Sequence, residues 1–305
     1  MAFDAEFDDL VRTSAFAHLR VVQLTTGGPV RREHVSQFQF DGERIALMDP
    51  QRGIRKPRQL DAALSFRTVH ADRPAQRPYD DVPGPDGFLR YKWRGTDASH
   101  PENRAMRRAL ERRLPLIWFH GIDVGLYLPL FPVWLVDEEP DRHQFIVALD
   151  HMQMSSWESG LGSSELQRGH ALATTRVRLH QPMFRARVLA AYETSCSICH
   201  LKHQELLDAA HIRPDSEGGE PIVPNGLALC KIHHAAYDSN MVGIDGDYTI
   251  NVRHDLLEES DGPTLRHSIQ EMHGASLLLP KRRAARPNRD LLEERFEHFQ
   301  SAGAA

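Results

Sequence analysis

Cysteine is scarce in this sequence: only three occur in 305 residues, and all three lie between positions 196 and 230. So few cysteines exclude the disulfide framework of small secreted domains, and their clustering favours a metal site instead. The sequence also lacks any apolar run near the roughly 18 residues that cross a bilayer. The acidic, amphipathic stretch at the N-terminus (MAFDAEFDDLVRTSAF) differs from a signal peptide. We therefore expect a cytoplasmic protein with no membrane partner.

Excess positive charge is missing as well, because the formal net charge is -5. This value argues against a nucleic-acid-binding surface that covers the whole protein. The charge is unevenly distributed, however: residues 20–115 hold 19 Lys and Arg against 12 Asp and Glu, whereas residues 137–165 hold seven acids and one Arg. A basic N-terminal half beside an acidic connector is compatible with a DNA-binding face.

The length predicts two domains, because one hydrophobic core seldom grows beyond about 250 residues. Over residues 1–154, short apolar runs such as LSFRTV, FLRYKW, PLIWFHGI and QFIVALD lie between Gly, Pro and Asp and predict strands. ENRAMRRALERRL predicts a helix among them. The small, polar stretch 155–169 predicts a linker, and residues 170–305 a second domain. We expect the α+β class, with a mixed, mostly β, barrel-like first domain.

Three further elements are predicted in the second domain. LHQPMFRARVLAAYETS predicts a helix with Phe184, Val188, Leu189 and Tyr192 on one face. MVGIDGDYTINV predicts a hairpin, and NRDLLEERFEHF a helix that packs back on the domain.

The three cysteines form a metal-binding pattern together with one histidine. Cys196 and Cys199 make a CxxC, and Cys230 and His233 make a CxxH. Structural zinc takes four such ligands in a closed tetrahedron, two from each of two turns. The alternative is three buried thiols without a metal and a surface histidine, but free cysteines seldom fall at this spacing by chance. The sequence therefore predicts a structural Zn²⁺ site.

A second set of residues is interleaved with the zinc ligands: His211 in AAHI, Asn225 in PNGLALC, and His234 beside His233. This order resembles the HNH (ββα-metal) endonuclease motif, with the McrA-like restriction nucleases as the nearest branch. The resemblance covers roughly residues 180–255. It implies a C-terminal ββα-metal HNH domain with a zinc knuckle, acting on double-stranded DNA.

The resemblance also implies the roles of these residues. His211 is the general base that takes a proton from water, and Asn225 orients its imidazole through a hydrogen bond. His234 binds the catalytic divalent ion, Mg²⁺ or Mn²⁺. Many HNH nucleases have a second metal ligand directly before the general base, whereas this sequence has Ala210. The second protein ligand is then Asn225, Asp208 or none.

Other polar residues near the motif have simpler interpretations. Asp238 is expected to orient a histidine or a neighbour on its helix rather than to touch the ion. His200, His203 and His254 are expected at the surface.

The first domain contains the stretches RGIRKPRQLDAALSFRT, GFLRYKWRGTD, PLIWFHGI and LYLPLFPVWLV. With these it resembles the sensor half of bacterial HNH proteins assigned to modification-dependent (type IV) restriction. Their sensor belongs to the SRA/PUA-like small β-barrels, which implies recognition of a modified base, commonly a modified cytosine, flipped and stacked between aromatic rings. Barrel core is the alternative role for most of the aromatic residues. The candidates for DNA or modified-base binding are Tyr79, Trp93, Arg94, Arg55 and Arg67.

Three functions are consistent with the sequence. The first is an endonuclease, typical of type IV restriction and antiviral defence, that cuts modified foreign DNA. The second is an HNH nuclease that senses unmodified sequence or a phosphorothioate backbone. The third is a non-catalytic zinc-knuckle DNA reader, against which the complete His, Asn and His set argues. Because a ββα site handles one strand at a time, a double-strand break also predicts a homodimer.

Overall fold

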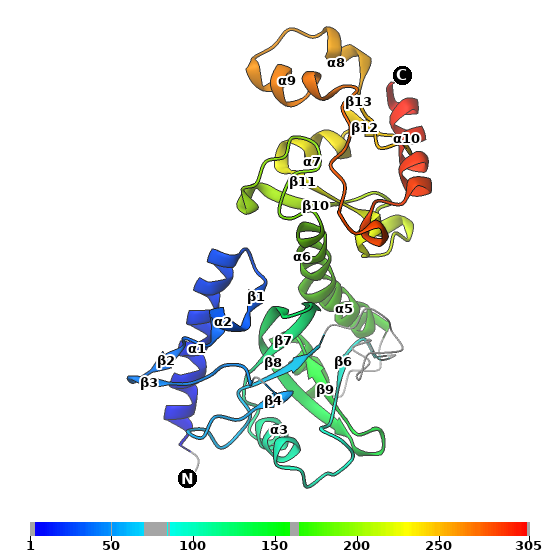
Figure 1. The fold of residues 1–305 in the computed structure, drawn as a ribbon. Coiled ribbons are helices and arrows are strands. Elements are labelled where there is room, and N and C mark those ends of the chain that lie inside the picture. Colours follow the sequence, from blue (N-terminus) through cyan, green and yellow to red (C-terminus); the bar gives the residue numbers. More distant parts are fainter. Residues whose placement is uncertain (1–3, 50, 70–83, 85, 159–164, 304–305) are drawn as a thin grey trace. The chain divides into compact units, whose positions relative to one another are not determined.

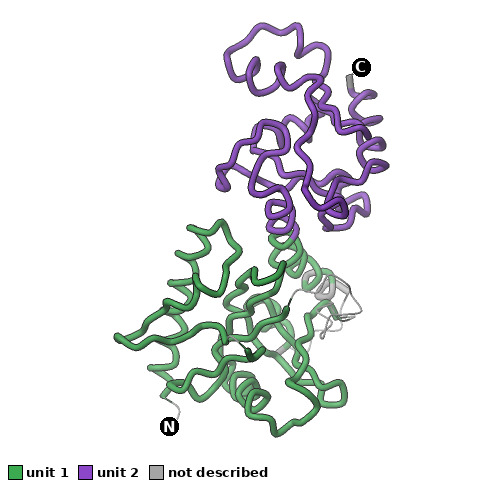
Figure 2. The backbone as a smooth tube through the Cα atoms, viewed as in Figure 1, with its two compact units in different colours: residues 1–183 green, residues 184–305 purple. Residues whose placement is uncertain are grey.

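The computed structural model describes residues 4–49, 51–69, 84, 86–158 and 165–303. The chain divides into two compact units, residues 1–183 and residues 184–305 (Figure 2). Each unit has its own cluster of buried apolar residues and contains both helices and strands, which confirms the expected α+β class. Among the described residues, no helix is long and apolar enough to cross a membrane.

Unit 1 is built around a curled sheet. Its described strands are β1 (Val30–Arg31), β4 (Ile54–Arg55), β5 (Ser65–Thr68), β6 (Leu89–Lys92), β7 (Leu116–Asp123), β8 (Leu126–Glu139) and β9 (Gln144–Ala148). They run in the order β4, β5, β7, β8, β9, β6, with β1 added to β8 (Figure 1). Strand β8 pairs with β7 along its first half and with β9 along its second, and a register shift between Leu135 and Asp137 interrupts the second pairing. Irregularities of this kind bend a strand, so the sheet curls into a half-barrel.

Helix α1 (Ala5–Thr26) packs an apolar face against this sheet. It begins after Asp4, whose side chain accepts a hydrogen bond from the backbone N–H of Phe7 at 3.1 Å. Val11, Ala15 and Leu19 follow one another at single-turn spacing and belong to the same buried cluster as residues of β7. The remaining elements of the unit's first part are α2 (Arg32–Val35), β2 (Gln39–Phe40), β3 (Glu43–Arg44) and α3 (Pro101–Glu111).

Several helical segments lie between the sheet of unit 1 and the first strand of unit 2. They are α4 (His151–Glu158), α5 (Glu165–Thr175), a π-helical turn (Arg176–His180) and α6 (Gln181–Ala191). The stretch expected as a linker, residues 155–169, thus includes the end of α4 and the start of α5. The division between the units comes later, between Met183 and Phe184. The physical reason is that the π-helical turn joins α5 to α6 without a break, so the chain enters unit 2 as a helix.

Unit 2 is centred on an antiparallel hairpin of β10 (Leu207–His211) and β11 (Gly226–Cys230), against which α7 (Lys231–Asp238) packs. The predicted second hairpin is confirmed as β12 (Val242–Ile244) and β13 (Ile250–Val252). Two short helices follow, α8 (His254–Glu258) and α9 (Pro263–Ser268), and the predicted C-terminal helix is α10 (Arg289–Gly303), which packs against β12. The predicted helix before the first cysteine is α6, and its expected apolar face is buried.

Candidate active site and metal centre

Cys196, Cys199, Cys230 and His233 meet in one cluster, and their ligand atoms all lie within 4.8 Å of one another. The Sγ atoms of Cys199 and Cys230 are 3.9 Å apart. Nδ1 of His233 lies 3.2 Å from Sγ of Cys230 and 3.5 Å from Sγ of Cys196. A tetrahedral zinc ion with Zn–S bonds of about 2.3 Å requires ligand atoms roughly 3.5 to 3.8 Å apart. The cluster could therefore hold a zinc ion.

The second ring nitrogen of His233 is held by the backbone. Its Nε2 lies 2.5 Å from the carbonyl oxygen of Ser268, at the end of α9. A neutral imidazole that donates from Nε2 leaves the lone pair of Nδ1 directed at the sulfurs. Such a carbonyl partner is the usual way in which a metal-binding histidine is oriented.

The electrostatics of the cluster favour a cation at its centre. Hydrogen bonds with Cys196 and Cys199 lower the pKa of Cys230, whereas hydrogen bonds with Cys196 and Cys230 raise the pKa of Cys199. Burial alone would lower the pKa of His233, but its hydrogen bonds with Cys196 and Cys230 raise it to about 10, so a bound zinc ion would take the place of the proton on Nδ1. Thiolates this close together repel one another, so a divalent cation would stabilise all of them in the deprotonated form.

The loop between β10 and β11 is fixed by the amide of Asn225. His211 ends β10 and lies opposite Gly226, the first residue of β11. Oδ1 of Asn225 accepts a hydrogen bond from the N–H of Arg213 at 2.9 Å. Its Nδ2 donates to the carbonyl oxygens of Arg213 at 3.0 Å and Glu220 at 2.9 Å. These hydrogen bonds hold the loop backbone beside His211 and not the imidazole.

His234, on α7, lies between two carboxylates. Its Nδ1 is 3.8 Å from Oδ2 of Asp208 on β10, and its Nε2 is 3.4 Å from Oδ2 of Asp238, one turn further along α7. The two carboxylates face opposite nitrogens of the ring, so a divalent ion such as Mg²⁺ or Mn²⁺ could be held by one ring nitrogen together with the carboxylate on that side. The two adjacent histidines thus face different surroundings, His233 the sulfurs and His234 the carboxylates.

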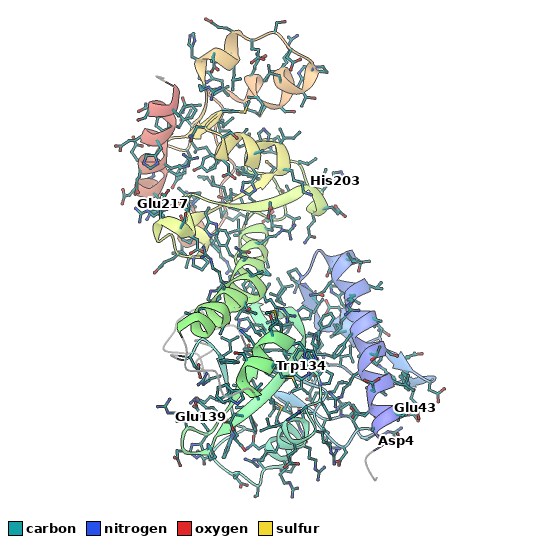
Figure 3. All side chains as sticks on the ribbon, turned by 180° about the vertical axis from the view of Figure 1, so that it is seen from behind. Asp4, Glu43, Trp134, Glu139, His203 and Glu217 are labelled. Carbon is teal, nitrogen blue, oxygen red and sulfur yellow. The ribbon has the colours of Figure 1, made fainter. Side chains whose placement is uncertain are left out.

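Two residues of α6 contact this region through contacts that sequence reasoning did not predict, although Arg185 could be read from the sequence as a ligand of backbone phosphate or as part of a solvated helix face. Phe184 was expected only as helix core, yet its ring stacks on the imidazole of His211 with centroids 3.9 Å apart. Arg185 donates to the carbonyl oxygen of Leu207 at 2.8 Å, and its Nε lies 3.3 Å from Oδ1 of Asp208. No local spacing links α6 to β10, so only the packing of the helix could show these contacts. The other nearby histidines, His200, His203 and His254, are exposed as expected (His203 is labelled in Figure 3).

The predicted aromatic candidates in unit 1 do not form an open stacking surface in the described residues. Tyr79 lies outside these residues. Trp93 is only 4% exposed, with the guanidinium of Arg107 4.7 Å from the centre of its ring. The rings of His143 and Phe145 lie 5.2 and 6.2 Å from it. The proposed base-stacking role of Trp93 is therefore corrected to a core role, because neighbouring side chains cover the indole.

The predicted arginines differ in their availability. Arg94 is exposed. Arg67 contacts the hydroxyl of Tyr127 at 3.4 Å. Arg55 donates to the carbonyl oxygen of Ala46 at 3.0 Å and lies 3.8 Å from Asp49. Arg55 also lines a surface hollow of about 480 Å³, whose other lining residues are Glu43 (labelled in Figure 3), Arg44, Lys56, Arg58 and Gln59.

Comparison with known proteins places the second unit in a nuclease family. Residues 196–245 match the model of an HNH endonuclease family. No curated protein matches the chain. One similar solved structure is the modification-dependent TagI restriction endonuclease, with 16% identity and a TM-score of 0.29 over 81% of this chain and 85% of that chain. Another is the type IV phosphorothioation-dependent restriction endonuclease ScoMcrA, with 15% identity and a TM-score of 0.24 over 60% of this chain and 51% of that chain. The matched residues include the whole metal cluster and also His211, Asn225 and His234. The second unit of this chain therefore carries an HNH endonuclease domain.

Proposed function

We propose that this chain is a type IV restriction-like DNA endonuclease that hydrolyses phosphodiester bonds in double-stranded DNA carrying modified bases, with modified cytosine as the base read. One observation supports the assignment of the active site. The three residues of the HNH pattern come together on one ββα unit: His211 at the end of β10, Asn225 directly before β11, and His234 on the helix packed against both strands. The preference for modified DNA rests on the resemblance of the first domain to modification sensors.

In this proposal His211 is the general base. An imidazole exchanges a proton near neutral pH and can take one from the attacking water. As a residue His211 is partly exposed, although its Nε2 atom is buried, and its ring is supported by Phe184.

His234 would hold the catalytic Mg²⁺ or Mn²⁺, with a carboxylate of Asp208 or Asp238 as the oxygen ligand that Ala210 cannot supply. When bound, the ion offsets the negative charge that develops on the phosphate. Asn225 fits this role poorly, because it is 1% exposed and its Oδ1 already accepts a hydrogen bond from Arg213. Arg185 holds Asp208 toward His234 from the opposite side.

Asn225 would orient His211 through the backbone. Its carbonyl oxygen accepts a hydrogen bond from the N–H of Ile212 at 3.0 Å, and its side chain holds Arg213 and Glu220. The two residues that follow His211 are therefore both fixed by Asn225. Loss of these bonds would allow the end of β10 to move, and with it the general base.

Unit 1 is proposed as the SRA/PUA-like sensor of the modified base. The basic hollow that Arg55 lines is suited to backbone phosphate, since it brings four cationic side chains together with one carboxylate. Arg94, which is exposed, and Tyr79, which lies outside the described residues, remain candidates for the base itself. A sensor for unmodified sequence or for a phosphorothioate backbone is the alternative.

Cleavage of supercoiled plasmid tests the proposal. The full-length protein, with Mg²⁺ or Mn²⁺, is given plasmid with no modification, with methylated cytosine, or with phosphorothioate linkages. We expect cleavage of the methylated plasmid and a loss of about 100-fold or more in His211→Ala. Equal cutting of all three plasmids would exclude a modification sensor, and an active His211→Ala would overturn the proposed mechanism.

Because one ββα site cuts one strand, we also propose a homodimer, for which light scattering should give twice the monomer mass.

A further inference from the structure

The imidazole of His211 has an aromatic ring against one of its faces. Phe184, near the start of α6, is 3% exposed, and its ring is nearly parallel to the imidazole, with an angle of 14° between the planes and 3.9 Å between the centroids. A stack this close restricts rotation of the imidazole about its side-chain bonds, because any swing toward α6 would collide with the ring.

The strand opposite His211 leaves room for this stack. Gly226, its cross-strand partner, has φ of -136° and ψ of 144°, an extended conformation open to any residue. The position therefore requires the small size of glycine and not its backbone freedom. A Cβ at Gly226 would lie 2.8 Å from Cζ of Phe184 and 2.5 Å from a methyl carbon of Val188, closer than real side chains approach. With glycine there, the edge of the Phe184 ring lies directly against the strand.

Other contacts of α6 hold Phe184 at this depth. The hydroxyl of Tyr192, two turns along, donates to the carbonyl oxygen of Gly226 at 3.3 Å. Arg185, the next residue, donates to the carbonyl oxygens of Gln204 and Leu207 at 3.2 and 2.8 Å. The helix is thus bound to both strands of the hairpin, so the ring and the imidazole cannot shift independently.

From these contacts we propose that Phe184 is a positioning residue for the general base: its ring fixes the plane of the His211 imidazole, and Gly226 provides the space that it needs. The inference rests on the proposed role of His211. Phe184 touches neither DNA nor metal ligand in this account and acts only through the imidazole.

Phe184→Leu in the full-length protein tests the inference, because leucine is apolar but has no flat face. The matched control is Phe299→Leu on α10, where a buried phenylalanine packs against Gly243 and Phe296 in the same unit. Both variants should bind zinc and DNA like the parent and lose similar thermal stability. Only Phe184→Leu should lose turnover, by about 10- to 100-fold at unchanged KM, because small displacements of a reacting group have effects of that size. Equal turnover in the two variants would overturn the inference.

Proton NMR of the histidine ring gives a readout that does not need activity. The ring current of Phe184 should move the carbon-bound protons of the His211 imidazole upfield, and Phe184→Leu should remove this shift while Phe299→Leu leaves it. The resonance is assigned by its disappearance in His211→Gln. If Phe184→Leu fails to fold, Phe184→Met, which is closer in length, is measured in the same way. An unchanged resonance would overturn the inference even if cleavage fell. If the His211 resonance is shifted upfield as expected but the His211→Gln variant still cuts DNA, the result would instead contradict the proposed function.

Discussion

Two adjacent histidines have different surroundings because successive residues of a helix point in different directions. His233 is 1% exposed and directs Nδ1 to the sulfurs of Cys196 and Cys230. His234, one residue later on α7, lies between Asp208 and Asp238 instead. Successive residues of an α-helix point about 100° apart, which is enough to direct one ring at the sulfurs and the other at the carboxylates.

This separation predicts different failures for the two alanine variants. His233→Ala should lose its zinc and unfold unit 2, because a structural zinc ion contributes directly to folding. His234→Ala should keep its zinc and melting temperature but lose cleavage by about 100-fold or more. Zinc content by mass spectrometry, thermal melts and plasmid cleavage check the pair. A zinc-free His234→Ala protein would contradict the assignment.

The carboxylate that accompanies His234 can be identified by titrating the metal. Asp208→Asn and Asp238→Asn preserve side-chain shape but remove the charge, and asparagine is a weaker ligand for a hard ion. The variant that loses a true ligand should need about 10-fold more Mg²⁺ for half-maximal cleavage. Asp255→Asn, an exposed carboxylate on α8 paired with Arg253, is the control. If neither active-site variant changes the Mg²⁺ requirement, His234 does not hold the ion with these carboxylates.

At the scale of elements, strand β6 is tied to its surroundings by a partly buried charge network. The guanidinium of Arg90 bonds Asp86 at 2.8 Å and Glu139 at 3.0 Å. Burial would raise the pKa of both carboxyl groups, but their hydrogen bonds, those from Arg90 included, outweigh it and hold the pKa of each below its ordinary value. The network therefore favours the ionised carboxylates in the folded state.

The sign of the pH dependence follows from these lowered pKa values. The stabilisation is fully present above the ordinary pKa values of 3.8 and 4.5 and is lost as the pH falls through the lowered values. We expect the melting temperature of unit 1 to fall below about pH 4 in the parent. Arg90→Met should melt lower at pH 7 and show a weaker further fall in acid. Parallel pH curves for the two proteins would exclude this network as a source of acid sensitivity.

At the scale of the whole molecule, the two units differ in the metal ligands that their described residues bring together. The Cys3His cluster joins the segment before β10, the end of β11 and the start of α7, so it holds the middle of unit 2 together. The described residues of unit 1 contain no comparable cluster of metal ligands, and its core of α1 and β7 is apolar.

Removal of zinc should therefore unfold one unit and leave the other. With a strong zinc chelator, calorimetry of the full chain should show the transition of unit 2 shifted down or lost and the transition of unit 1 unchanged. Adding zinc back should restore the calorimetric profile of the untreated protein. A single transition that moves as a whole would show that the units unfold together.

What the sequence by itself determined is mostly local. A CxxC and a CxxH each place two ligands in one turn, so Cys196, Cys199, Cys230 and His233 were identified from spacing, and the structure brings all four together. The amphipathic face of α6, the β12–β13 hairpin and the helix α10 were predicted for the same reason, since periodicity and turn residues act over a few positions. The order of His211, Asn225 and His234 was equally visible.

The tertiary structure decided what lies next to these residues. It buried Trp93 under Arg107, although the sequence had made this ring a candidate for contact with a modified base. It also directed the amide of Asn225 to the loop backbone and placed Phe184 on His211. These contacts join segments far apart in the chain, and their partners are chosen by which helix faces fit which strands. A linear sequence specifies the ligands of a metal within one turn, but the neighbours of a side chain depend on packing that only the folded chain provides.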